Sequence, residues 1–85
     1  MDSHQKVWDA IDAIAQSAGL TPSGLAKAAG MDATAFNRSK RYEPHGRQRW
    51  PSVETIQKIL DATGTTWSEF AHLVENGPPA DPQNE

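Results

Sequence analysis

The chain contains no cysteine, which excludes disulfide frameworks, thiolate zinc sites and cysteine nucleophiles. It also has no apolar run near the length needed to cross a bilayer, and its first five residues do not lead into a signal-peptide core. A cytoplasmic protein with no membrane partner is therefore expected. Eighty-five residues leave room for one domain with a modest core.

Catalytic and metal-binding patterns are missing as well. The sequence shows no Ser/His/Asp set, no phosphate-cradling glycine loop and no paired-carboxylate arrangement. The three histidines, His4, His45 and His72, lack the spacing of metal ligands. We expect a protein that is not an enzyme and that needs no metal or cofactor.

Positive charge is scarce overall but concentrated in one stretch. The whole chain has a net charge of −3, whereas residues 20–51 carry +4 and the remainder carries −7. The six cations of this stretch are Lys27, Arg38, Lys40, Arg41, Arg47 and Arg49. Such a separation predicts a basic face on an acidic body, as in nucleic-acid-binding domains, although a solvated loop with scattered arginines would give the same count.

Apolar residues recur three and four positions apart, and no segment alternates long enough to form a strand. The pattern predicts an all-α fold with five helices. The first helix covers residues 5–18. The second runs over residues 22–29 behind the N-cap Thr21, and the third over residues 33–40 behind the cap Asp32.

The second half of the chain carries a loop, two helices and a tail. Residues 42–51 contain two prolines and a glycine and are expected to form a loop. Ser52 caps the fourth helix, which Gly64 closes, and the capping box of Thr66 opens the fifth helix. Residues 1–76 thus form the domain, and residues 77–85, rich in proline, form a disordered tail or a truncated linker.

The stretch from Leu20 to Arg41 is predicted to hold two short helices around a tight turn at Gly30. Ala26 is small enough for a close helix crossing. The inward-facing residues are Leu25, Ala29, Met31 and Phe36. The third helix would then stand on the surface with four outward side chains, Ala33, Thr34, Asn37 and Arg38.

This stretch, followed by a loop and by Pro51-Ser-Val-Glu-Thr, resembles the lambda-repressor-like (XRE/Cro-type) family of helix-turn-helix transcriptional regulators over residues 5–75. The resemblance implies a compact five-helix domain with the helix-turn-helix at helices 2 and 3. It implies that the third helix enters the major groove, as a homodimer on a palindromic operator. The expectation is therefore sequence-specific binding of double-stranded DNA by a bacterial or phage repressor, associated with the nucleoid. The proline-rich ending resembles the linker of LexA and phage-repressor regulators, which carry a C-terminal peptidase and dimerisation domain.

Base contacts are assigned to the outward side chains of the third helix. Asparagine matches adenine and arginine matches guanine, so Asn37 and Arg38 are expected to read base edges, and Ala33 or Thr34 to touch a thymine methyl. The expected backbone contacts are Thr21, Ser23, Lys40, Arg41, Arg47 and Arg49. The arginine-rich loop 42–51 is expected on the backbone or in the minor groove. Pro22 stands where the family commonly has a phosphate-gripping glutamine, so Ser23 or the helix N-terminus would replace that contact.

The main alternative is a protein-interaction module, such as an antitoxin or adaptor, built on the same helical scaffold. The charge separation favours DNA, since an adaptor has no need to concentrate cations on one helix and one loop. The large aromatic residues are expected in the core rather than as stacking platforms: Trp8, Trp50, Trp67 and Phe70.

Overall fold

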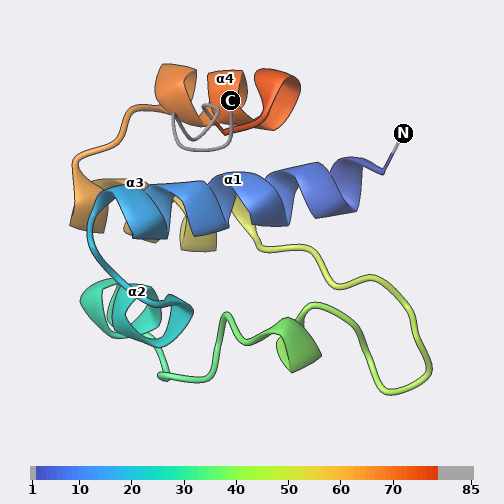
Figure 1. The fold of residues 1–85 in the computed structure, drawn as a ribbon. Helices are drawn as coiled ribbons and strands as arrows, with labels where there is room; N and C mark the ends of the chain where they lie inside the picture. Colours follow the sequence, from blue (N-terminus) through green and yellow to red (C-terminus); the bar gives the residue numbers. More distant parts are fainter. Residues whose placement is uncertain (1, 79–85) are drawn as a thin grey trace.

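The computed structural model describes residues 2–78, which form an all-helical domain. Its elements are α1 (Ser3–Ser17), α2 (Pro22–Ala28), the 3₁₀ turn η1 (Arg38–Lys40), α3 (Val53–Thr63) and α4 (Trp67–Asn76). The helix α1 runs through the middle, with α4 on one side and α2 on the opposite side, and α3 packs against both α1 and α2 (Figure 1). None of the helices in this range is long and apolar enough to cross a membrane.

The helix ends follow the capping residues in the sequence. The side chains of Thr21, Ser52 and Thr66 each accept a backbone N–H from the first turn of the helix that follows. Thr66 and Glu69 satisfy each other's backbone groups in the expected capping box. One cap was missed: Asp2 accepts a backbone N–H from the first turn of α1, which therefore begins at Ser3 rather than at residue 5.

The apolar stripes of the helices meet in one core. Ile11 of α1, Leu25 of α2 and Ile59 of α3 are almost completely buried in it. Ala26 is also fully buried, as a small residue at a close helix contact must be, and Phe36 joins the core from the chain after α2. Leu25 and Phe36 were predicted to face inward and Ala26 to lie at a close helix crossing, and their burial confirms that they belong to the core. The expected tail lies outside the described residues beyond Pro78.

The predicted third helix over residues 33–40 is wrong, and the described chain has four α-helices instead of five. The backbone N–H groups of Ala35 and Asn37 donate to carbonyls three residues back, not four. Asp32 accepts both the backbone N–H (2.9 Å) and the hydroxyl (2.6 Å) of Thr34 and so closes a local turn. Asn37 is extended, with φ −61° and ψ 148°. Side chains that bond to the nearby backbone compete with helix formation, which explains the difference.

Two of the four large aromatic residues assigned to the core lie outside it. Trp8 and Phe70 are buried, as expected. Trp50, however, is 52% exposed and Trp67 is 42% exposed. The indole N–H of Trp67 donates to the side-chain carbonyl of Gln57 at 2.8 Å, which holds the ring along α3 and α4 at the surface.

Candidate functional site

Residues 31–51, which join α2 to α3, are called the basic segment below. Four of its five cations, Arg38, Lys40, Arg47 and Arg49, have exposed side chains. Its two acids are Asp32 and Glu43, and Glu43 lies 3.6 Å from the imidazole of His45. The exposed charge of the segment is therefore predominantly positive.

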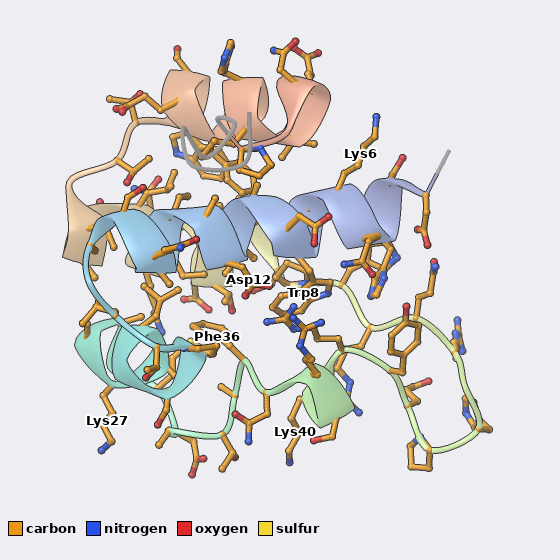
Figure 2. The ribbon with its side chains drawn as sticks, viewed as in Figure 1. Lys6, Trp8, Asp12, Lys27, Phe36 and Lys40 are labelled. Carbon is orange, nitrogen blue, oxygen red and sulfur yellow. The ribbon has the colours of Figure 1, made fainter. Side chains whose placement is uncertain are left out.

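Further positive charge lies next to the basic segment on α2. Lys27 is exposed, and Figure 2 shows Lys27 and Lys40 extending from the same side of the molecule. Lys6 of α1 extends from the opposite side. Lys27 of α2 thus adds positive charge on the side from which Lys40 extends.

Arg41 is the exception, because it is only 4% exposed. Its two terminal nitrogens donate to the Asp12 carboxylate at 2.7 and 2.9 Å. The guanidinium also donates to the carbonyl of Phe36 at 3.0 Å and lies 4.7 Å from the centre of the Trp8 ring. The buried guanidinium is thus bound within the chain, and these contacts replace the expected phosphate contact of Arg41 by a structural role.

The loop of the basic segment has a defined shape. Tyr42 and Gln48 form an isolated antiparallel bridge. Inside it, Glu43 N–H donates to the Arg47 carbonyl at 2.7 Å, and Gly46 turns the chain with φ +93°, a conformation that favours glycine. The loop thus presents the Arg47 side chain from a short hydrogen-bonded turn.

The base contacts expected on one helix face are distributed over a turn and a 3₁₀ turn. Ala33 is half-buried, and the hydroxyl of Thr34 is bound to Asp32. Asn37 and Arg38 are exposed, and the Asn37 side chain makes no capping hydrogen bond to η1. The predicted exposure of Asn37 and Arg38 is therefore confirmed, but the predicted helix over residues 33–40 is absent.

A groove of about 400 Å³ brings several of the expected contacts together. Thr34 and Lys40 line it from one part of the basic segment, and Arg49 and Trp50 from the other. The N-cap residue of α3, Ser52, lies at the same groove. Arg38 instead borders a smaller hollow of about 250 Å³ beside the start of α2. Lys40 and Arg49, which are distant in sequence, are thus neighbours at one groove.

The groove also contains a carboxylate. The pKa of Asp32 lies below its ordinary value, first because the Thr34 hydroxyl donates to the carboxylate and then because the Thr34 backbone N–H does so. Asp32 therefore stays ionised close to Lys40. A ligand phosphate would be attracted by the cations of the groove but not by its Asp32 end.

The start of α2 holds the remaining two expected contacts. Thr21 is exposed, and its hydroxyl oxygen accepts the Gly24 N–H at 3.0 Å. Ser23 is half-buried. The Thr21 side chain is thus already used as the N-cap of α2.

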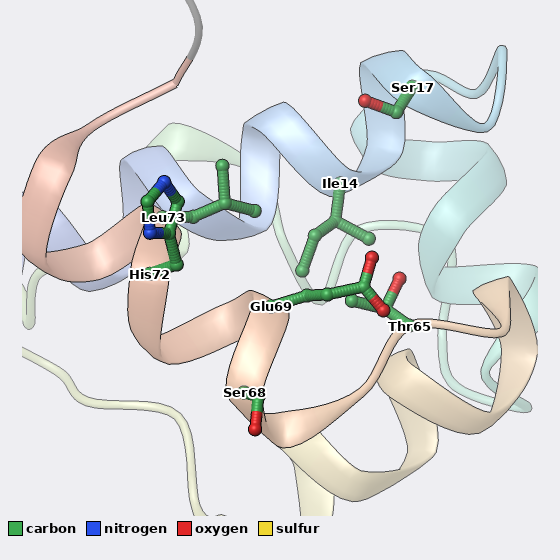
Figure 3. Close-up of a pocket in the computed structure, with 7 residues that line it drawn as sticks. All are labelled: Ile14, Ser17, Thr65, Ser68, Glu69, His72 and Leu73. Carbon is green, nitrogen blue, oxygen red and sulfur yellow. The ribbon is translucent and has the colours of Figure 1, made fainter.

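Another hollow, of about 420 Å³, lies between α1 and α4 (Figure 3). Ile14 and Leu73 form its apolar part, and Ser17 and Ser68 lie on opposite sides of it. The carboxylate of Glu69 accepts the N-cap N–H of α4 at 3.0 Å, so it serves the helix end. The residues that line this hollow include no lysine or arginine, so it offers a polyanion no cationic contact.

Two functional candidates on α1 were missed from the sequence. His4 is buried, and its Nε2 lies 2.9 Å from the Arg41 carbonyl and 3.1 Å from the Arg49 carbonyl. Asp12 holds the Arg41 guanidinium, as described above. The only sequence signal was the spacing of four between His4, Trp8 and Asp12, which places all three on one face of α1.

Comparison of the chain with protein-family models, curated proteins and solved structures found no match. The function is therefore argued from the site itself. That site is the basic segment: four exposed cations, the exposed amide of Asn37, and a groove between the turn at residues 32–36 and the start of α3.

Proposed function

We propose that this protein binds double-stranded DNA through the basic segment and acts in transcriptional regulation. The observation that carries the proposal is the exposure of Arg38, Lys40, Arg47 and Arg49 on one segment of a chain with net negative charge. Duplex DNA is a dense, regular polyanion, and exposed lysine and arginine side chains bind it by neutralising its phosphates. The acidic remainder repels the same polyanion and favours approach from the basic side.

The contacts divide into two kinds. Lys40, Arg47 and Arg49 are proposed to neutralise phosphates, together with Thr21 and Ser23 at the start of α2. Asn37 and Arg38 are proposed to read base edges, with Ala33 and Thr34 beside them. The reading element is thus a turn followed by η1, and Arg41 is no longer among the contacts.

Assembly follows from the size of the surface. One copy offers only a short reading element, so we propose that two copies bind as a homodimer on a palindromic operator, with half-sites about one helical turn apart. The regulatory outcome proposed with it is repression, since a protein bound at an operator blocks access to the promoter.

A protein-interaction role remains the second candidate, and exposed apolar side chains favour it. Trp50 and Val53 are exposed near the start of α3, and Trp67 is exposed on α4. Such side chains occur at protein interfaces when they form one patch. The DNA proposal ranks higher because it also explains the four exposed cations.

The test compares two single-lysine variants in binding to a labelled duplex pool at low salt. Lys40→Ala removes an exposed cation of the basic segment, and Lys58→Ala removes an exposed cation of α3. We expect Lys40→Ala to weaken binding to all duplexes and Lys58→Ala to leave it nearly unchanged. Equal losses of affinity in both variants would mean that binding depends on the net charge of the chain and not on the basic segment. Absence of duplex binding by the unmodified chain would overturn the proposal.

A further inference from the structure

Three side chains on one face of α1 hold the basic segment in place. His4, Trp8 and Asp12 follow one another at intervals of four residues, so they project from the same side of the helix. Figure 2 shows Trp8 and Asp12 on the side of α1 that faces the basic segment. Asp12 binds the Arg41 side chain, whereas His4 and Trp8 reach the backbone on both sides of the loop.

The backbone contacts join the two ends of loop 42–48. His4 Nε2 lies 2.9 Å from the carbonyl of Arg41, just before the loop, and 3.1 Å from that of Arg49, just after it. The Trp8 indole N–H reaches the same Arg49 carbonyl at 3.1 Å. The two ends are also bound directly, since Arg49 N–H donates to the Arg41 carbonyl at 2.9 Å. His4 therefore lies at the closure point of the loop.

The surroundings of His4 select one tautomer. Both carbonyls can only accept a hydrogen bond, so Nε2 must carry the proton. The Trp8 indole nitrogen lies 3.1 Å from both His4 Nε2 and the Arg49 carbonyl. It can only donate, so with Nε2 protonated it donates to the carbonyl. His4 Nδ1 is buried without a hydrogen-bond partner among residues 2–78, so it fits as an unprotonated atom. A proton there would be a buried donor with no acceptor.

Two aromatic rings hold the imidazole from the loop side. The ring centre of Tyr42 lies 4.9 Å from that of His4, and the ring centre of Trp50 lies 5.6 Å from it. Tyr42 and Trp50 are the residues next to Arg41 and Arg49 along the chain. The buried imidazole is thus fixed by hydrogen bonds at one nitrogen and by ring contacts around it.

We propose that His4, in its Nε2–H form, is the positioning residue that fixes loop 42–48 and thereby holds Arg47 and Arg49 in the arrangement that meets DNA phosphates. The inference rests on the proposed function. A loop that is already ordered loses little conformational entropy when it binds, whereas a free loop must be ordered at the expense of affinity. His4 itself is buried and touches no ligand.

The first test is spectroscopic and needs no DNA. A long-range ¹⁵N–¹H correlation spectrum of the intact chain reports which imidazole nitrogen of His4 is protonated. We expect a single Nε2–H tautomer, since its donor is held by two carbonyls. A protonated Nδ1, or rapid exchange between the two tautomers, would overturn the assignment.

The second test compares His4→Leu with His4→Gln. Leucine fills the space without a donor, whereas the glutamine amide can still donate to the two carbonyls. We expect His4→Leu to raise the amide exchange rate of Arg49 and to weaken duplex binding about 2- to 12-fold, the range of one lost hydrogen bond. His4→Gln should restore most of both properties. Equal losses in the two variants, or unchanged affinity in His4→Leu, would overturn the positioning role.

Two controls separate positioning from stability and from folding failure. Ile59→Val lowers the stability of the core away from the loop, and its duplex affinity should equal that of the unmodified chain. Trp8→Phe removes the N–H that reaches Arg49 and replaces the indole by a smaller ring, and it should raise Arg49 exchange and weaken binding less than His4→Leu. The positioning role of His4 would be overturned if Ile59→Val lost as much duplex affinity as His4→Leu. It would also be overturned if Trp8→Phe left the amide exchange rate of Arg49 unchanged.

The outcomes distinguish this inference from the proposed function. Faster Arg49 exchange in His4→Leu with unchanged duplex affinity overturns the positioning role and leaves DNA binding standing. Failure of the unmodified chain to bind duplex DNA overturns the proposed function, and the positioning role with it, even when the tautomer is as assigned.

Discussion

The helical frame of α1–α4 and the basic segment are held in shape by different forces. The frame buries side chains such as Ile11, Leu25 and Ile59 at helical spacing, so its stability comes from apolar burial. The basic segment buries Phe36 and packs Met31 and Ala35 partly against the same core, and after Phe36 it makes polar contacts to α1 through His4 and Asp12. Residues 38–49, which carry the exposed cations, bury no apolar side chain and take their shape from contacts with the frame.

This difference explains why one cation of the basic segment, Arg41, is buried while the other four are exposed. Arg41 supplies the cation that ties the basic segment to Asp12, and its charge is neutralised there. The other four cations keep their charge toward solvent. Within the basic segment, Arg41 therefore has a structural role, whereas the four exposed cations are available to a polyanion.

The largest effect is expected at Phe36, the apolar residue of the basic segment that is buried in the core of the frame. Phe36 is 2% exposed, and its ring centre lies 6.2 Å from that of Trp8. Phe36→Ala should lower the free energy of unfolding by about 3–5 kcal/mol, because it removes transfer energy and leaves a cavity. Urea denaturation measures the loss. A loss below about 1 kcal/mol would show that the segment does not depend on this anchor.

A somewhat smaller effect is expected from the ion pair that links the two regions. Arg41→Met leaves the Asp12 carboxylate without its partner and should lower the free energy of unfolding by about 2–4 kcal/mol. The value is below that of a fully buried pair because the Asp12 side chain is 31% exposed.

The control for the ion pair is the double variant Asp12→Leu/Arg41→Met. It removes both charges, so it should recover part of the stability that Arg41→Met loses. Arg38→Ala, which truncates an exposed arginine, should change the stability by less than about 0.5 kcal/mol. Equal losses for Arg38→Ala and Arg41→Met would contradict the division between structural and exposed arginines.

The frame could be predicted from the sequence because its signals are local. Spacing of three and four marks the buried stripes, and Thr21, Ser52 and Thr66 mark helix starts through contacts within one turn. The same reasoning was wrong at residues 33–40, where Asp32 and Thr34 form a side-chain turn that competes with the helix. Several poor helix formers within eight residues were the signal against that helix.

The candidate site was predictable only in part. The exposure of four cations was expected from their charge and position: Arg38, Lys40, Arg47 and Arg49. Arg41 has the same charge and lies in the same stretch, so nothing in the sequence marked it as the buried one. Its partner Asp12 lies 29 residues away, and His4 lies 37 residues from the carbonyl that it binds. Such pairs depend on the tertiary fold, and one sequence gives no local sign of them.

The third prediction concerns the sequence preference on DNA and distinguishes contacts to base edges from contacts to phosphates. Asn37→Ala or Arg38→Ala should weaken binding to the preferred site by roughly 1–3 kcal/mol and relax the preference at one position of each half-site. Lys40→Ala should weaken all sequences about equally. Selection from a random duplex pool measures both. A changed preference in Lys40→Ala, with an intact one in the other two variants, would contradict the assignment.

The smallest effect is expected at the exposed turn of Asp32. Its pKa is lowered in the folded chain by the Thr34 hydroxyl and then by the Thr34 N–H. The ionised carboxylate therefore stabilises the folded state above its ordinary pKa, and this contribution is lost as the pH falls through the lowered value. An NMR titration of Thr34→Val should show the pKa of Asp32 closer to its ordinary value. An unchanged pKa would assign the lowering to another group.

The most direct measurement of the central claim is the salt dependence of duplex affinity. If each copy neutralises about four phosphates, a bound pair neutralises about eight, and affinity should fall on the order of 10³-fold or more between about 50 and 200 mM salt. Arg49→Ala should flatten the slope of log affinity against log salt by about one for each bound copy, whereas Arg41→Met should leave it unchanged. A slope near zero, or equal flattening by the two variants, would contradict the proposed role of the basic segment.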